Sequence, residues 1–161
     1  MQFKNWKLLE IQDNIIHIEY DAYQFKKALF KKLNILENNQ FNYLDRRETE
    51  ISWRSMDQYF NFNFDNSILD DKLELMFKKS ELKTTNEVLV FYNHENIAIE
   101  INTNLLISEW EDFFQSTKFN TIIINRKHHL IMEVSRDYIL HSNFKIWNDD
   151  IYCTATSTNK I

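Results

Sequence analysis

Three acidic side chains, Glu109, Glu111 and Asp112, fall within four positions of the sequence, in the stretch SEWEDFF. Carboxylates at this spacing could form the solvated face of a helix, supply a carboxyl pair for acid–base catalysis, or bind a basic partner. Neighbouring positions on a helix point in different directions, which disfavours the catalytic pair. The solvated face and the partner surface both remain open.

The apolar residues around these acids have helical spacing. We expect a helix over residues 105–117, capped by Asn104. Its buried side would comprise Leu106, Trp110, Phe113, Phe114 and Thr117. Residues 65–119 carry eleven acidic and five basic side chains, a net charge of −6, against −5 for the whole chain. A surface of this charge suits a basic protein and disfavours direct binding to nucleic acid.

A second group of residues could ligate a metal ion. His128, His129, Glu133 and Asp137 lie close together in the sequence, and such side chains can hold a metal that activates water. The segment SRD (135–137) is typical of a turn, however, and His-x-x-x-His spacing is missing. We therefore predict no metal, no cofactor and no enzymatic activity, with a small metal-assisted enzyme as the alternative.

The composition excludes several classes of function. The 161 residues include no Gly and no Pro, so glycine-dependent phosphate loops and nucleophile elbows are ruled out. The single cysteine, Cys153, excludes an intramolecular disulfide. Since no long apolar run or signal-like N-terminus is present, we expect a cytoplasmic protein that does not enter a membrane. Turns that require positive φ must use Asn or Asp.

Hydrophobic periodicity predicts a single α+β domain over residues 1–161, with a mainly antiparallel sheet and two or three helices packed on one face. The expected helices cover residues 22–36, 67–82 and 105–117. The expected strands cover residues 6–11, 15–20, 50–55, 59–64, 87–92, 97–102, 121–125, 130–135 and 138–146. The first two strands should form a hairpin, and so should 87–92 with 97–102. The tail from about residue 154 should be flexible.

SEWEDFF and the segments EVLVFYNHENIAIEI and LIMEVSRDYILHSNFKI resemble those of bacterial immunity proteins from polymorphic-toxin or contact-dependent growth inhibition systems. The resemblance covers about the C-terminal 75 residues of the 161. It implies a small, acidic α+β protein that binds a cognate toxin domain and blocks its active site or its access to substrate. Many such toxins are basic nucleases, which an acidic surface would suit.

The candidate partner-binding residues are Glu109, Glu111, Asp112, Asp70, Asp71, Trp53 and Trp110. The acids would make charged contacts, and the two tryptophans would be aromatic anchors, although Trp110 also suits the core. A third hypothesis is a homo-oligomeric regulatory protein that associates through the aromatic strand YFNFNF.

Overall fold

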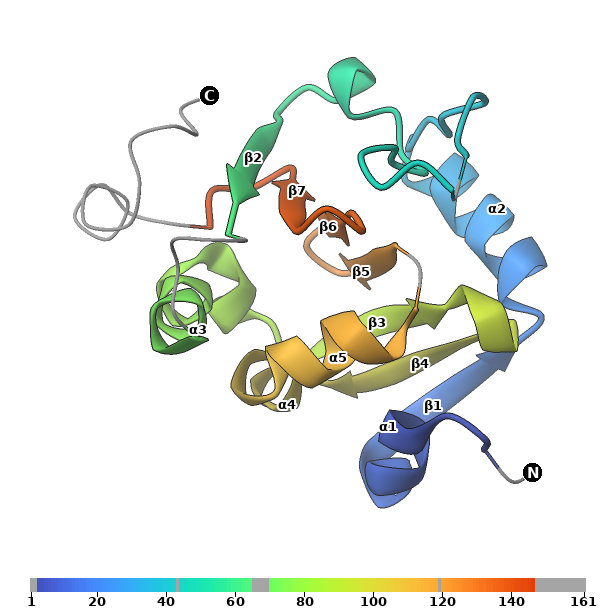
Figure 1. Cartoon of the computed structure of the whole chain (residues 1–161), viewed down its shortest axis with the longest axis vertical. Coiled ribbons are helices and arrows are strands. Elements are labelled where there is room, and N and C mark those ends of the chain that lie inside the picture. Colours follow the sequence, from blue (N-terminus) through green and yellow to red (C-terminus); the bar gives the residue numbers. More distant parts are fainter. Residues whose placement is uncertain (1–2, 43, 65–69, 119, 147–161) are drawn as a thin grey trace.

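A seven-stranded antiparallel sheet forms the centre of the computed structural model, which describes residues 3–42, 44–64, 70–118 and 120–146. Its strands are β1 (Ile15–Tyr20), β2 (Phe60–Asn63), β3 (Glu87–Tyr92), β4 (Ile97–Asn102), β5 (Thr121–Asn125), β6 (Leu130–Val134) and β7 (Ile139–Ser142). They lie in the order β1-β4-β3-β5-β6-β7-β2, so β1 and β2 form the two edges (Figure 1). The predicted α+β fold with an antiparallel sheet is confirmed.

Helices cover both faces of this sheet, where the sequence predicted one (Figure 1). One layer contains α1 (Trp6–Glu10), α3 (Asp70–Lys79), α4 (Thr103–Ser108) and α5 (Trp110–Ser116), and the other contains α2 (Ala22–Lys32). Strand β3 shows why both faces need cover. Val88 and Val90 face the α5 layer, while Leu89 and Phe91 face the α2 layer, because successive strand residues point to opposite sides.

The predicted hairpin of residues 6–11 with 15–20 is wrong in its first half. Residues 15–20 form β1, which pairs with β4, but residues 6–10 form α1. Asn5 caps this helix, since its side-chain oxygen accepts hydrogen bonds from the amides of Lys7 and Leu8. The residues KLLE, which follow Trp6 in this helix, are all good helix formers.

The predicted helix over 105–117 is divided into α4 and α5 at Glu109, whose φ is −122°. The hydroxyl of Ser108 donates to the carbonyl of Leu105, three residues earlier, and bonds of this kind bend helices. The predicted cap at Asn104 is replaced by Asn102, whose side chain accepts from the Asn104 amide. The predicted buried side of the helix is confirmed, because each of its five apolar-side residues is buried.

Residues 33–42 and 44–59 lie over the α2 face of the sheet without forming the predicted strand at 50–55. Ile51 makes an isolated bridge to Glu37, and Trp53–Ser55 is a 3-10 turn. Ile51 and Trp53 are buried against the sheet. Their segment does not extend the sheet, because its amides donate to a buried carboxylate of β6, as described below.

The remaining predicted elements are confirmed with shifts at their ends. The helix expected over 22–36 ends at Lys32, and the strand expected over 59–64 is β2. The β3–β4 hairpin and strands β5 and β6 lie where predicted, whereas the strand expected over 138–146 is β7, which ends at Ser142. Residues 65–69, which include the expected helix start, and the tail beyond 146 lie outside the described residues. Within the described part of the chain, no helix is long and apolar enough to cross a bilayer.

Positive φ values follow the expected chemistry only in part. Asp21, Asn34 and Asn96 take φ between 53° and 58°, as predicted for a chain without glycine. Lys118, His129 and Tyr138 also have positive φ, so the restriction to Asn and Asp is wrong. These three residues are all exposed at their turns.

Candidate partner-binding surface

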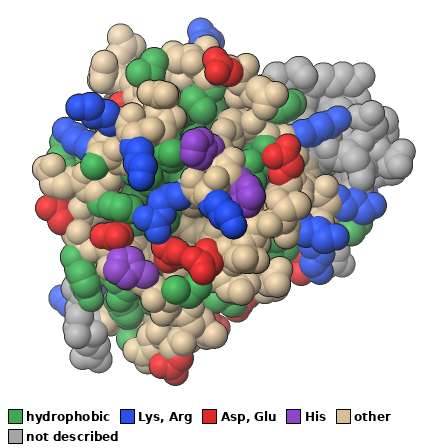
Figure 2. Space-filling model, turned by 180° about the vertical axis from the view of Figure 1, so that it is seen from behind, with side chains coloured by type: hydrophobic (Ala, Val, Ile, Leu, Met, Phe, Trp, Pro, Cys, Tyr) green, Lys and Arg blue, Asp and Glu red, His purple; other side chains and the backbone are tan. Residues whose placement is uncertain are grey.

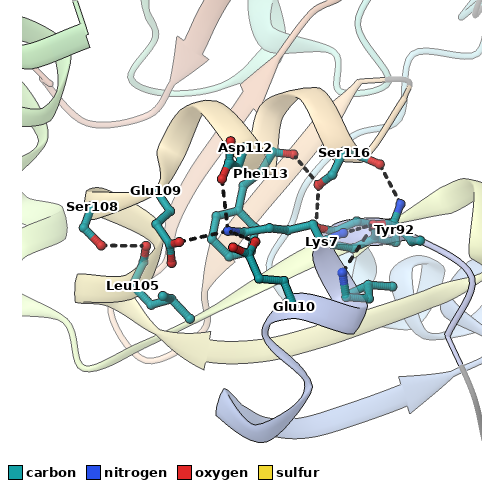
Figure 3. Close-up of polar contacts among 11 residues, drawn as sticks. Lys7, Glu10, Tyr92, Leu105, Ser108, Glu109, Asp112, Phe113 and Ser116 are labelled. Carbon is teal, nitrogen blue, oxygen red and sulfur yellow. Dashed lines mark hydrogen bonds and ion pairs between the residues drawn. The ribbon is translucent and has the colours of Figure 1, made fainter.

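Two of the predicted acids, Glu109 and Asp112, converge on a lysine from the other end of the chain. The Nζ atom of Lys7 lies 2.8 Å from Glu10 Oε2, 3.0 Å from Glu109 Oε1 and 3.2 Å from Asp112 Oδ2 (Figure 3). It also lies 5.2 Å from the centre of the Phe113 ring. We call Glu10, Glu109 and Asp112, together with Lys7, the acidic cluster.

The cation of the acidic cluster is buried, and the carboxylates are at the surface. The Lys7 side chain is 0% exposed, whereas those of Glu10, Glu109 and Asp112 are 54%, 33% and 43% exposed. Burial lowers the pKa of Lys7, but hydrogen bonds from its ammonium group to the three carboxylates outweigh burial and leave this pKa raised. Three carboxylates against one ammonium leave two negative charges on the solvent side.

Asn5 fixes α1 against α5, which brings Lys7 to this position. Its side-chain amide donates to the Ser116 carbonyl at 2.8 Å, while its oxygen caps α1. The buried hydroxyl of Tyr92 lies 2.7 Å from Ser116 Oγ, which ties the end of α5 to the sheet. One asparagine thus begins α1 and holds it beside the helix that carries Glu109 and Asp112.

The bend between α4 and α5 sets the direction of Glu109. This residue ends α4 and precedes α5, so its side chain leaves the chain at the bend and reaches Lys7 (Figure 3). The carboxyl oxygens of Glu10, Glu109 and Asp112 lie within 4.8 Å of one another, a spacing that would also suit a metal ion. Here the ammonium group of Lys7 bonds to all three, so the structure assigns them a protein cation as partner.

The other predicted contact residues lie in different places. Glu111 is exposed on α5 and accepts a hydrogen bond from Gln115 at 3.3 Å. Asp70 begins α3 and Asp71 follows, but their side chains lie outside the described part. Trp110 and Trp53 are buried, packed against Phe64 and stacked on Tyr59 respectively, so neither presents a ring to a partner.

The exposed aromatic residue beside the acidic cluster is Trp6, which the sequence-based interpretation missed. Its side chain is 51% exposed, and it lies on α1 four residues before Glu10, on the same side of the helix. Leu9 on the same helix is also exposed. The signal that could have identified Trp6 was the cap at Asn5, because a helix that starts there aligns Trp6 with Glu10.

The alternative metal site is not assembled. His128 and His129 lie in the exposed turn between β5 and β6, and Asp137 lies in the turn at the other end of β6, where it pairs with Arg47 at 3.6 Å. Glu133 lies between these turns on β6 and is fully buried. The candidate ligands are therefore at opposite ends of a strand or inside the protein.

Glu133 instead holds residues 50–53 against the sheet. Its Oε2 accepts from the Glu50 amide at 2.7 Å and Asn120 Nδ2 at 2.8 Å. Its Oε1 accepts from the Ile51 amide at 3.1 Å and Trp53 Nε1 at 3.0 Å. Burial raises the pKa of Glu133 to about 7, against the lowering effect of these donors.

His141 pairs with Glu133 across strands β6 and β7 and belongs to an aromatic group on the same face. Its ring stacks near those of Trp53 and Tyr59, and its Nδ1 lies 2.8 Å from the Tyr59 hydroxyl. Its Nε2 is buried without a hydrogen-bond partner among the described residues. Burial lowers the pKa of His141 to about 4, so the ring is neutral at physiological pH.

Other parts of the surface mix charges of both signs. Figure 2 shows the side hidden in Figure 1, where Lys and Arg side chains are interspersed with Asp, Glu and His. Arg126 and Glu100, for example, form an ion pair at 2.6 Å. The acidic cluster differs because its cation is buried and its carboxylates face solvent.

Comparisons with known proteins gave no match, whether with family models, curated proteins or solved structures.

Proposed function

We propose that this protein is an immunity-type inhibitor, which binds a basic cognate toxin domain and blocks its active site or its access to substrate. The acidic cluster carries the proposal. Three surface carboxylates held on one buried cation leave two negative charges in a fixed arrangement. The exposed ring of Trp6 lies beside them, and aromatic anchors next to charged groups are typical of protein interfaces.

Preorganisation is what distinguishes this cluster from ordinary surface acids. Lys7 holds the carboxylates in place before any partner arrives, so the protein loses less side-chain entropy on binding. The excess negative charge would attract a basic surface over a distance and orient it during approach. Glu111, which is exposed on α5, would add a further negative charge on the same helix.

The proposal is tested by co-expression with the C-terminal domain of the neighbouring upstream gene product, since immunity genes normally lie beside their toxin genes. We expect the protein to restore growth. The variant Glu109→Gln with Asp112→Asn should lose at least about tenfold in affinity for the toxin domain, because it removes two charges yet keeps oxygen acceptors for Lys7.

The matched control is Glu37→Gln with Asp57→Asn, which removes two charges from exposed residues outside the acidic cluster. This variant should protect as well as the parent protein. Absence of protection by the parent protein would overturn the proposed function. Equal loss in both variants would show that net charge, and not the acidic cluster, determines binding.

A further inference from the structure

Strand β1 has a free edge in the described part of the chain. Strand β4 pairs with one side of β1, and no described strand pairs with the other. The opposite edge of the sheet, β2, has four residues, whereas β1 has six. A long free edge exposes backbone N–H and C=O groups that can pair with another strand.

Exposed apolar side chains gather along this edge. Ile16 and Tyr20 of β1 are 53% and 56% exposed. Ile18 is partly buried against the core on the α5 side. Large apolar residues on an open strand edge are typical of surfaces that another chain covers.

The sequence of β1 is complementary to itself in a single antiparallel register. A twofold axis at Ile18 places His17 of one copy opposite Glu19 of the other, on both sides of the axis. The same register brings Ile16 of one copy near Tyr20 of the other. A slip of two residues in either direction would place Glu19 opposite Glu19, or His17 opposite His17.

His17 and Glu19 are already in contact within one strand. His17 Nε2 lies 3.0 Å from Glu19 Oε1, and both residues face the α2 side, opposite Glu100 and Ala98 of β4. The β-bulge lies between Ile15 and His17, so residues 17–20 form a regular stretch around the proposed axis. The bulge therefore affects only the pairing of Ile16 in one copy with Tyr20 in the other.

We propose that β1 pairs with β1 of a second copy, in antiparallel orientation centred on Ile18, to form a continuous fourteen-stranded sheet from two seven-stranded ones. The occupant of the edge is the same chain because the register matches the imidazole of His17 with the carboxylate of Glu19 and apolar group with apolar group. This inference does not depend on the proposed function, since it involves a different surface and a different partner.

Sedimentation velocity up to high micromolar concentrations tests the proposal. The parent protein should form a dimer, and His17→Glu should raise its dissociation constant about tenfold or more, because two pairs of carboxylates then face each other. The double variant His17→Glu with Glu19→His should restore the dimer. His128→Glu, which makes the same charge change in an exposed turn, should have no effect.

A disulfide test reports the register directly. In a Cys153→Ser background, Ile18→Cys should cross-link to itself under mild oxidation, because directly opposed residues lie about 4.5–5.5 Å apart between Cα atoms. Asn63→Cys on the β2 edge should not cross-link. A monomer at all concentrations would overturn the proposal. A dimer that His17→Glu leaves intact, or one that cross-links through residue 63, would also overturn it and indicate another interface.

Discussion

At the residue scale, Lys7 determines how two of the acidic side chains of SEWEDFF are arranged. The acids of SEWEDFF are not a purely solvated face, since two of them share a buried ammonium group with Glu10. A fully buried lysine is unfavourable without paired charges, so these carboxylates also stabilise the fold. A test of binding must therefore separate the charge of the carboxylates from their structural contact with Lys7.

We predict that Lys7→Met lowers the free energy of unfolding by roughly 2–3 kcal/mol, because three carboxylates lose their common cation. Chemical denaturation measures the change. Lys31→Met, at an exposed position of α2, should change stability by less than about 0.5 kcal/mol. Adding Glu109→Gln and Asp112→Asn to Lys7→Met should recover part of the loss, and no recovery would contradict the charge-based explanation.

At the element scale, Glu133 replaces strand pairing as the support of residues 50–53. Two backbone amides and the Trp53 indole donate to one carboxylate on β6, so the segment lies on the sheet without joining it. The same site contains His141 on β7, and burial shifts the pKa of each residue in the direction that keeps it neutral. The two pKa shifts make the free energy of unfolding depend on pH in opposite directions.

Glu133→Gln should lower the free energy of unfolding relative to the parent protein. The difference between the two proteins should shrink as the pH rises from 4.5 to 7. The folded-state pKa of Glu133 is raised from 4.5 to about 7, so its contribution to stability is fully present below 4.5 and decreases up to 7. Glutamine does not titrate, and the variant escapes this loss, which is on the order of 3 kcal/mol. Urea denaturation across this pH range measures the difference.

His141→Gln is the control for that experiment, because its trend should be the reverse. The folded-state pKa of His141 is lowered from 6.5 to about 4. The contribution of His141 to stability is therefore fully present above pH 6.5 and is lost as the pH falls toward 4. The deficit of His141→Gln should therefore be largest at neutral pH and shrink on acidification. Parallel trends in the two variants would contradict the assignment of opposite shifts.

At the scale of the whole molecule, the net charge of −5 and the placement of the acidic cluster bear on how a partner approaches. Charges held at the surface act over about 10 Å at moderate ionic strength, so they affect the rate of association more than the rate of dissociation. A basic toxin domain would be attracted to the molecule as a whole and oriented by the cluster.

We predict that the association rate with the toxin domain falls steeply as salt is added, while the dissociation rate changes little. Glu109→Gln with Asp112→Asn should make the association rate less sensitive to salt than the Glu37→Gln, Asp57→Asn control does. Stopped-flow measurements over a range of salt concentrations provide the comparison. An equal salt dependence in all proteins would show that the cluster does not orient the partner.

The sequence by itself determined most of the secondary structure and the fold class. The strands EVLVFY and IAIEIN are predictable from their β-branched and aromatic residues, because such side chains pack well on a sheet. The apolar side of residues 105–117 was also predictable from helical spacing alone. These features depend on neighbours in the chain, and the local pattern contains the necessary information.

Only the tertiary structure decided the candidate site. Lys7 meets Glu109 across 102 positions, and Glu50 meets Glu133 across 83, so no local spacing could indicate either contact. The segment at 50–53 has the composition of a strand, but a buried carboxylate competed for its amides and prevented strand pairing. Charged side chains find partners through the packing of whole elements, and that packing depends on residues spread along the entire chain.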